Sequence, residues 1–147
     1  MRRVERMLLE LNASYDGSPW HGTSLLQIIG GLSEEKALAH PGPGKRSIAE
    51  IVAHIMATMD IVQRRLTAES FEVTTEMDSP SISNVTWNDL LTRIQQSQTR
   101  LVDSVARMKD ADFDQNPPGK NYSVDFMLYG LLQHTAYHAG QIAMMKS

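Results

Sequence analysis

The strongest structural signal in the chain is the segment 47–66, which reads SIAEIVAHIMATMDIVQRRL. Ser47 and Glu50 form a capping-box pattern, in which each side chain satisfies a backbone N–H at the start of a helix. Apolar residues then recur at intervals of three and four: Ile48, Ile51, Val52, Ile55, Met59, Val62 and Leu66. This spacing predicts an amphipathic helix of about five turns. His54 lies beside its apolar stripe and is expected to face partly toward the core.

A second long helix is predicted after Thr86, which can cap it. Ser97 and Gln98 interrupt its apolar stripe where a hydrophobic residue is due. These polar residues could face a pocket or simply be tolerated in the core, and we favour the second interpretation. The rest of the stripe consists of Trp87, Leu90, Leu91, Ile94, Leu101, Val105 and Met108.

The last predicted helix follows Ser123, another potential cap. Its expected core stripe is Met127, Leu131, His134, His138, Ile142 and Met145. Two histidines would therefore lie in the middle of an apolar face. Such a placement needs an explanation, because burying a polar ring without partners costs about 1 kcal/mol or more.

The N-terminal part is predicted to add shorter helices. Val4, Met7, Leu8 and Leu11 have helical spacing, and the segment 20–29 leads into more helix. Ser33 can cap a short helix that must end before Pro41. The segments 69–83 and 110–121 contain proline without an apolar period, and we interpret them as a linker and a loop.

These patterns predict an all-α fold, a bundle of four main helices with a short extra helix near the N-terminus. No convincing alternating strand and no internal repeat are present in the sequence. The 147 residues are expected to form one domain, residues 1–147, because a chain of this length can bury about two thirds of its unfolded surface in a single core.

The composition argues against several classes of function. The net charge is -3 with 14 Lys and Arg residues and no basic patch, which argues against nucleic acid as the main partner. No stretch approaches the roughly 20 apolar residues that span a bilayer. Glu5 and Glu10 interrupt any apolar run after the basic N-terminus, so we expect no signal peptide and a cytoplasmic location. The chain has no cysteine, which excludes disulfides and thiolate ligands or nucleophiles.

His134 and His138 are four residues apart and project from one face of the predicted helix, a spacing that suits a metal ion. His54, on another helix, can supply a third imidazole. Zinc, nickel and related divalent ions accept such ligands, and a catalytic site keeps at least one position open for water or substrate. Alternatively, the two histidines of the last helix are core residues that hydrogen-bond to groups such as the Thr58 hydroxyl.

A zincin protease would carry a glutamate directly after the first histidine, as its general base. Thr135 occupies that position, so a metalloprotease of that kind is not predicted. The base would have to be another residue, the bound water or a co-substrate.

Other candidate residues are better explained structurally. Glu50 is one turn from His54, but its capping role already accounts for it. His21 could line the same pocket, although an exposed or capping role is favoured. His40 is predicted on a surface loop, and Tyr137 is predicted to pack against a neighbouring helix.

Three segments carry a resemblance to a known family: WHGTSLL at 20–26, PGKRSIAEIVAHI at 43–55 and HTAYHAGQI at 134–142. In combination they resemble the DinB-like superfamily of bacterial four-helix proteins, most of all its YfiT-type members. The resemblance implies an up-down-down-up bundle, frequent homodimers and a divalent metal, usually nickel or zinc. By motif, the ligands it implies are His54, His134 and His138.

The resemblance also implies candidate activities. Characterised relatives include transferases and isomerases that depend on low-molecular-weight bacterial thiols such as bacillithiol or mycothiol. By analogy, the metal would bind the thiol sulfur, lower its pKa and present a thiolate to a small-molecule electrophile. A metal-activated water for hydrolysis and a non-enzymatic stress or binding role remain alternatives.

Overall fold

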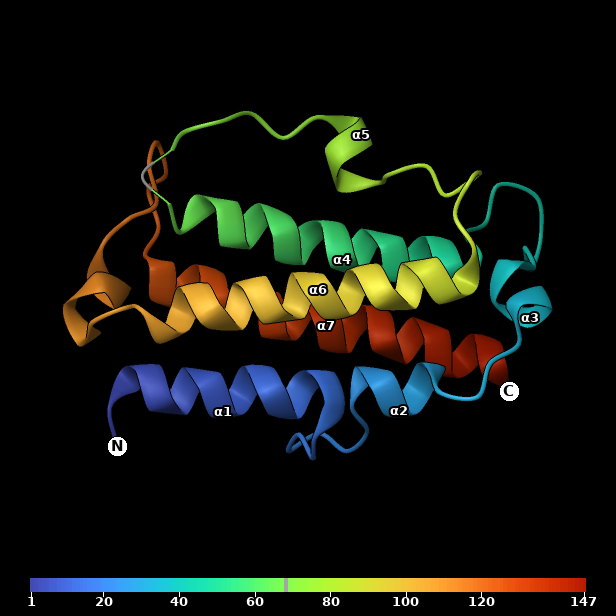
Figure 1. Ribbon diagram of the computed structural model, residues 1–147, viewed down its shortest axis with the longest axis horizontal. Coiled ribbons are helices and arrows are strands. Elements are labelled where there is room, and N and C mark those ends of the chain that lie inside the picture. Colours follow the sequence, from blue (N-terminus) through green and yellow to red (C-terminus); the bar gives the residue numbers. More distant parts are fainter. Residues whose placement is uncertain (68) are drawn as a thin grey trace.

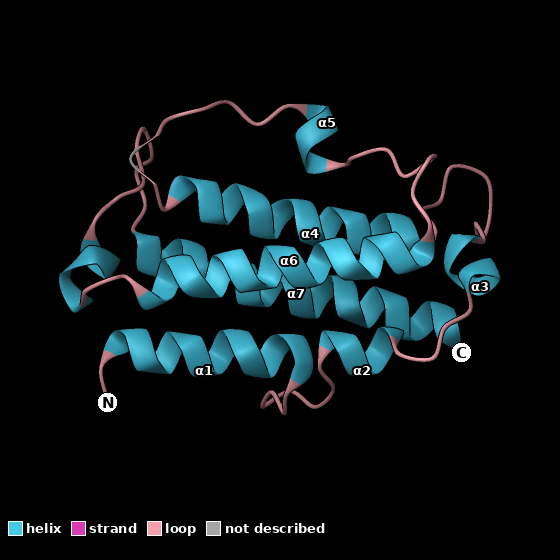
Figure 2. Ribbon diagram, viewed as in Figure 1, coloured by secondary structure: helices cyan, strands magenta, loops and turns pink. Residues whose placement is uncertain are grey.

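The structure is a computed structural model that describes residues 1–67 and 69–147. In these residues it contains helices and no strand (Figure 2). The elements are α1 Arg3–Asp16, α2 Leu25–Ile29, α3 Glu34–Leu38, α4 Ile48–Arg65, α5 Thr75–Asp78, α6 Trp87–Ala106, the 3-10 helix η1 Asp110–Asp114, and α7 Val124–Lys146. None of the helices in this part of the chain is both long and apolar enough to cross a membrane.

Four long helices, α1, α4, α6 and α7, lie side by side as a bundle (Figure 1). The helices α4 and α6 run in one direction, and α1 and α7 run in the other. The predicted up-down-down-up bundle is therefore confirmed. The connection from α4 to α6 returns along the outside of the bundle and carries α5, which packs on α4.

The predicted helix starts are formed by the expected caps. The Ser47 hydroxyl accepts a hydrogen bond from the Glu50 N–H at 3.1 Å, and the Glu50 carboxylate accepts one from the Ser47 N–H. Ser33, Thr86 and Ser123 cap α3, α6 and α7 in the same way with their hydroxyls. Because these bonds are local, they can be deduced from residue type and spacing.

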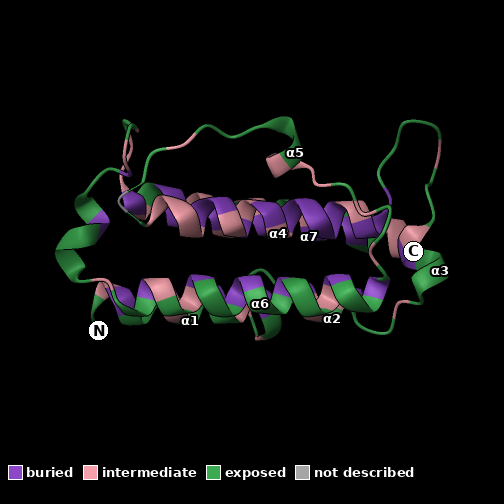
Figure 3. Cartoon of the chain, turned by 45° about the horizontal axis from the view of Figure 1, so that its top comes forward, coloured by how far each residue is buried: buried purple, intermediate pink, exposed green. Residues whose placement is uncertain are grey.

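Helix α4 is the central element of the core. It contacts α3, α5, α6 and α7, and most of its residues are buried (Figure 3). Its apolar stripe matches the predicted one over the helix, and Val52 and Ile55 are fully buried. The surroundings of His54, the histidine on this helix, are therefore formed by the helices that pack on α4.

Two segments predicted to be irregular contain short helices. The linker 69–83 includes α5, which Thr74 caps, and the loop 110–121 includes η1, in which Phe113 is fully buried. Helices of four or five residues are too short to show an apolar period, and their stability comes from tertiary contacts. The sequence predictions for these two segments were wrong in this respect.

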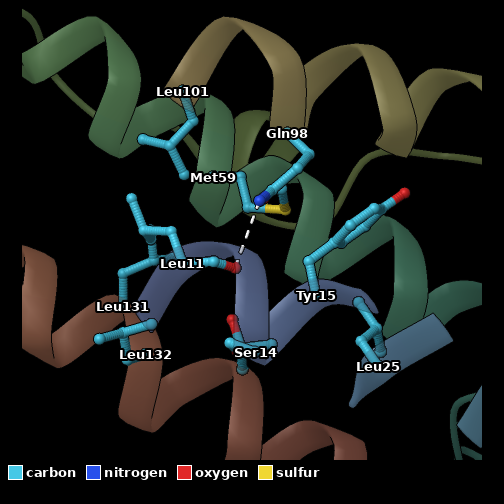
Figure 4. Close-up of a pocket in the computed structure, with 10 residues that line it drawn as sticks. Leu11, Ser14, Tyr15, Leu25, Met59, Gln98, Leu101, Leu131 and Leu132 are labelled. Atoms are coloured by element: carbon cyan, nitrogen blue, oxygen red, sulfur yellow. Dashed lines mark hydrogen bonds between the residues drawn. The ribbon is translucent and has the colours of Figure 1, made fainter. Parts of the chain in front are cut away.

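The polar interruption in α6 is accommodated inside the core. Gln98 is buried and donates a hydrogen bond from Nε2 to the main-chain oxygen of Leu11 at 3.3 Å (Figure 4). The cavity beside it has a volume of only about 10 Å³, room for about one water molecule. A ligand would not fit in this cavity, which supports the interpretation that Gln98 is tolerated in the core. Ser97 is also buried, and its hydroxyl accepts a hydrogen bond from the Arg100 guanidinium at 3.2 Å.

Replacing Ser47 by Ala removes the cap of the central helix. We expect the free energy of unfolding to fall by about 1 kcal/mol, because the Glu50 N–H loses its acceptor. Chemical denaturation followed by far-UV circular dichroism measures this change. Ser33→Ala removes the cap of the short α3 and should lower the free energy of unfolding by less. Equal stability of Ser47→Ala and wild type would contradict the assignment of Ser47 as a stabilising cap.

Candidate metal centre

Three histidines from two antiparallel helices meet at one point of the bundle. His54 comes from the second turn of α4, and His134 and His138 come from successive turns of α7. One ring nitrogen from each of the three lies within 4.8 Å of the others. The ring centroids are 4.4 to 4.9 Å apart. The structure therefore brings together all three residues that the sequence proposed, and together they could hold a metal ion.

The two histidines of α7 lie at the edge of its buried face, and the prediction that they occupy the middle was wrong. His134 and His138 are half-buried. The reason is that α7 carries only two charged residues, Asp125 and Lys146, so its apolar residues occur all round and do not define one face. The residues that are buried are Val124, Met127, Leu128, Leu131, Thr135, Ala139 and Ile142.

Hydrogen bonds orient two of the three imidazoles. His54 Nδ1 lies 2.7 Å from the main-chain oxygen of Asp78, which can only accept, so Nδ1 carries the proton. His138 Nδ1 similarly lies 2.7 Å from Oε1 of Gln141. In both rings the proton on Nδ1 leaves Nε2 with a free lone pair. Metal-binding histidines are commonly held in this way by a partner on the other ring nitrogen.

His134 completes the cluster and lacks such a partner. Its Nε2 is 3.1 Å from Nε2 of His54 and 3.5 Å from the Thr58 hydroxyl. Its Nδ1 is buried, and among the described residues it has no hydrogen-bond partner. The Thr58 hydroxyl itself donates to the main-chain oxygen of His54 at 3.1 Å. Within the part of the chain that the structure describes, Nδ1 of His134 has no partner in either interpretation, whether the ring binds a metal through Nε2 or is an ordinary core histidine. What sets the cluster apart is that Nε2 of His134 faces another imidazole nitrogen, Nε2 of His54.

The spacing of the facing nitrogens fits a shared cation. Two nitrogens bound to one tetrahedral ion at about 2.0 Å lie about 3.3 Å apart. The observed separation between Nε2 of His54 and Nε2 of His134 is 3.1 Å. The donors are all neutral nitrogen, which zinc and nickel accept, whereas calcium and magnesium prefer oxygen. The residues present thus fit a divalent transition metal.

The site keeps its imidazoles in the form that binds metal. Burial lowers the pKa of His134 to about 4, and the neighbouring His138 and His54 add to this shift, which Asp78 opposes. Burial also lowers the pKa of His138, against the effect of the Gln141 hydrogen bond. Both rings are therefore neutral near pH 7, and a neutral imidazole has the lone pair that a metal requires.

The other candidate residues are not part of the cluster. Glu50 caps α4 and also contacts His40, which is on the surface as predicted. His21 is exposed between α1 and α2. Tyr137 was predicted to pack against a neighbouring helix, and this was wrong: its side chain is 67% exposed. The Tyr137 ring instead lies edge-on to His138, with centroids 5.1 Å apart.

Sequence reasoning missed the two residues that orient the histidines. Asp78 lies in α5, inside a segment predicted to be a linker, and it acts through its main chain, so no sequence signal identified it. Gln141 is three residues after His138 on the same helix, a spacing at which side chains meet. That spacing was the available signal for Gln141.

Comparison with known proteins agrees with this architecture. Residues 20–142 match the sequence profile of the DinB superfamily. The chain belongs to this superfamily. The matched region contains all three clustered histidines, and superfamily membership and the cluster are both compatible with metal binding. No curated protein is detectably similar to the chain in sequence.

The metal-free protein should lose stability as the pH is lowered from about 6.5 toward about 4. His134 has a lower pKa folded than unfolded, so in this window the unfolded chain binds more protons and is favoured. Denaturation curves at several pH values, with a chelator present, measure the effect. His134→Gln should reduce the slope in this window, and a wild-type stability that does not change or that rises on acidification would contradict the assignment.

Proposed function

We propose that the chain binds a nickel or zinc ion through His54, His134 and His138 and is a transferase that joins a low-molecular-weight thiol to a small electrophile. The observation that carries this proposal is the set of three converging imidazoles, two of which present a free Nε2 lone pair. When bound, such an ion supplies Lewis acidity that lowers the pKa of a thiol or a water molecule at an open position.

The donor set favours an anionic co-ligand. Three neutral histidines leave the double positive charge of the ion uncompensated, and among the described residues no carboxylate belongs to the cluster. The closest acidic group, the Asp78 carboxylate, lies 3.8 Å from His54 Nδ1, on the ring nitrogen that also meets the Asp78 main chain. A thiolate would supply the missing negative charge. Since the chain has no cysteine, that thiolate must come from a co-substrate.

The position of Thr135 argues against protease-like hydrolysis. In a zincin the residue after the first histidine is the glutamate base. Here Thr135 is buried and lines the small core cavity next to Gln98, together with Leu11. A thiol transfer needs less help from a base, because lowering the thiol pKa already yields the nucleophile.

Thiol-dependent conjugation of monochlorobimane tests the reaction. We expect nickel- or zinc-loaded protein to accelerate conjugation with bacillithiol or mycothiol, and His134→Ala to reduce the rate more than about 100-fold because a ligand is lost. His40→Ala, which removes an exposed histidine outside the cluster, should retain the activity.

Two outcomes would contradict the transferase. Ester or amide turnover without any thiol would identify a metal-dependent hydrolase. Activity in neither assay, combined with stabilisation of the protein by added ligand, would identify a binding protein.

A further inference from the structure

A pocket of about 680 Å³ opens directly beside His138. Its walls come from the segment that precedes α4, from α4 itself and from the C-terminal turns of α7, which lie together at one end of the bundle (Figure 1). The pocket has a volume typical of small-molecule sites. The charged, apolar and imidazole side chains that line the pocket are Lys45, Arg46, Ile51, His138, Met144 and Met145.

One side of this pocket is positively charged. Lys45 and Arg46 are adjacent and exposed, and no acidic residue lines the pocket, although the chain as a whole has a net charge of -3. Among the described residues neither of them makes a salt bridge. Glu50, which lines the neighbouring pocket, is engaged by His40 and by the Ser47 N–H.

Arg46 is linked by a hydrogen bond to the segment that follows Asp78, whose main chain orients His54. Its guanidinium donates a hydrogen bond to the Ser79 hydroxyl at 2.8 Å, which ties it to the segment that follows Asp78. Arg46 and His138 line the same pocket. The positive side of the pocket therefore lies close to one of the candidate ligands.

The other side of the pocket is apolar. Ile51 is buried beneath it, and Met144 and Met145 lie along its wall on α7. Met144 is 80% exposed, so an apolar ligand in the pocket would cover surface that is otherwise in water. Methionine side chains are flexible and adapt to ligands of different shape.

We propose that this pocket binds an organic anion, a carboxylate or phosphate attached to an apolar group, as one reactant of the site. Lys45 and Arg46 hold the anionic group, the apolar group packs on Met144 and Met145, and the reacting end lies on the side of His138. The catalytic meaning of this pocket rests on the proposed function, whereas the binding of the anion does not.

Three probes with the same ring system test this: 2-naphthoate, 2-naphthyl phosphate and the uncharged 2-naphthylmethanol. With metal-loaded wild-type protein we expect at least one anion to bind roughly tenfold more tightly than the alcohol, since charge-assisted hydrogen bonds add to the apolar contact. The anion with the higher affinity identifies the headgroup. Calorimetry gives the affinities, and the methyl NMR signals of the nine methionines locate the ligand through shifts at Met144 and Met145.

Matched variants assign the preference to its residues. Lys45→Gln/Arg46→Gln should abolish the preference for the anions and leave the affinity for the alcohol unchanged. Arg107→Gln/Lys109→Gln makes the same charge change on exposed residues after α6, and it should behave like wild type. Thermal denaturation of both double variants checks that they fold.

Three results would overturn the proposal: equal binding of all probes, no binding of any probe, or an anion preference that persists in the Lys45→Gln/Arg46→Gln variant. The third result would mean that the metal, and not Lys45 and Arg46, binds the anionic group. These results are independent of the transferase assay. A protein that shows the anion preference but no thiol transfer would refute the proposed reaction and leave the anion-binding pocket supported. A protein that transfers thiol but shows no anion preference would refute the pocket and leave the proposed reaction supported.

Discussion

The site depends on the antiparallel packing of α4 against α7. This contact places His54 opposite two successive turns of α7, so that Nε2 of His54 and Nε2 of His134 are 3.1 Å apart. Neither helix alone has three ligands. The hydrogen bond from His54 Nδ1 to the Asp78 main chain then fixes the ring, which means that the long connection between α4 and α6 also contributes to the geometry. The long connection required by the bundle topology is thus used to orient a histidine.

Electrostatics follow from the same packing. Burial between the helices keeps His134 neutral well below pH 7, and a neutral ring is a ligand for a cation. The cluster holds no acidic ligand among the described residues, and the pocket beside it carries Lys45 and Arg46 without an acidic residue in its lining. Both features favour negative charge on the molecules that bind. A thiolate near the histidines and an organic anion near Lys45 and Arg46 would meet this requirement together.

What the sequence could predict was mainly what is local. Three correct predictions depend only on neighbours along the chain. They are the Ser47 cap, the apolar stripe of α4, and the placement of His134 and His138 on successive turns of one helix. His54 was found as the third member by pattern and resemblance. The orientation of α7 was predicted wrongly because a helix with almost no charged residues has no distinct polar face. The role of Asp78 could not be predicted, because it accepts the hydrogen bond with its main-chain oxygen, which every residue type has.

The proposed binding of one transition-metal ion by His54, His134 and His138 can be measured by elemental analysis of the purified protein. The protein should be purified without a histidine tag and analysed beside His54→Ala, His134→Ala, His138→Ala and the control His40→Ala. We expect about one nickel or zinc ion per chain in wild type and in His40→Ala, and loss of most of the metal in each of the other variants. Wild-type protein free of transition metal, together with variants that match it in metal content and stability, would rule out metal binding by these three histidines.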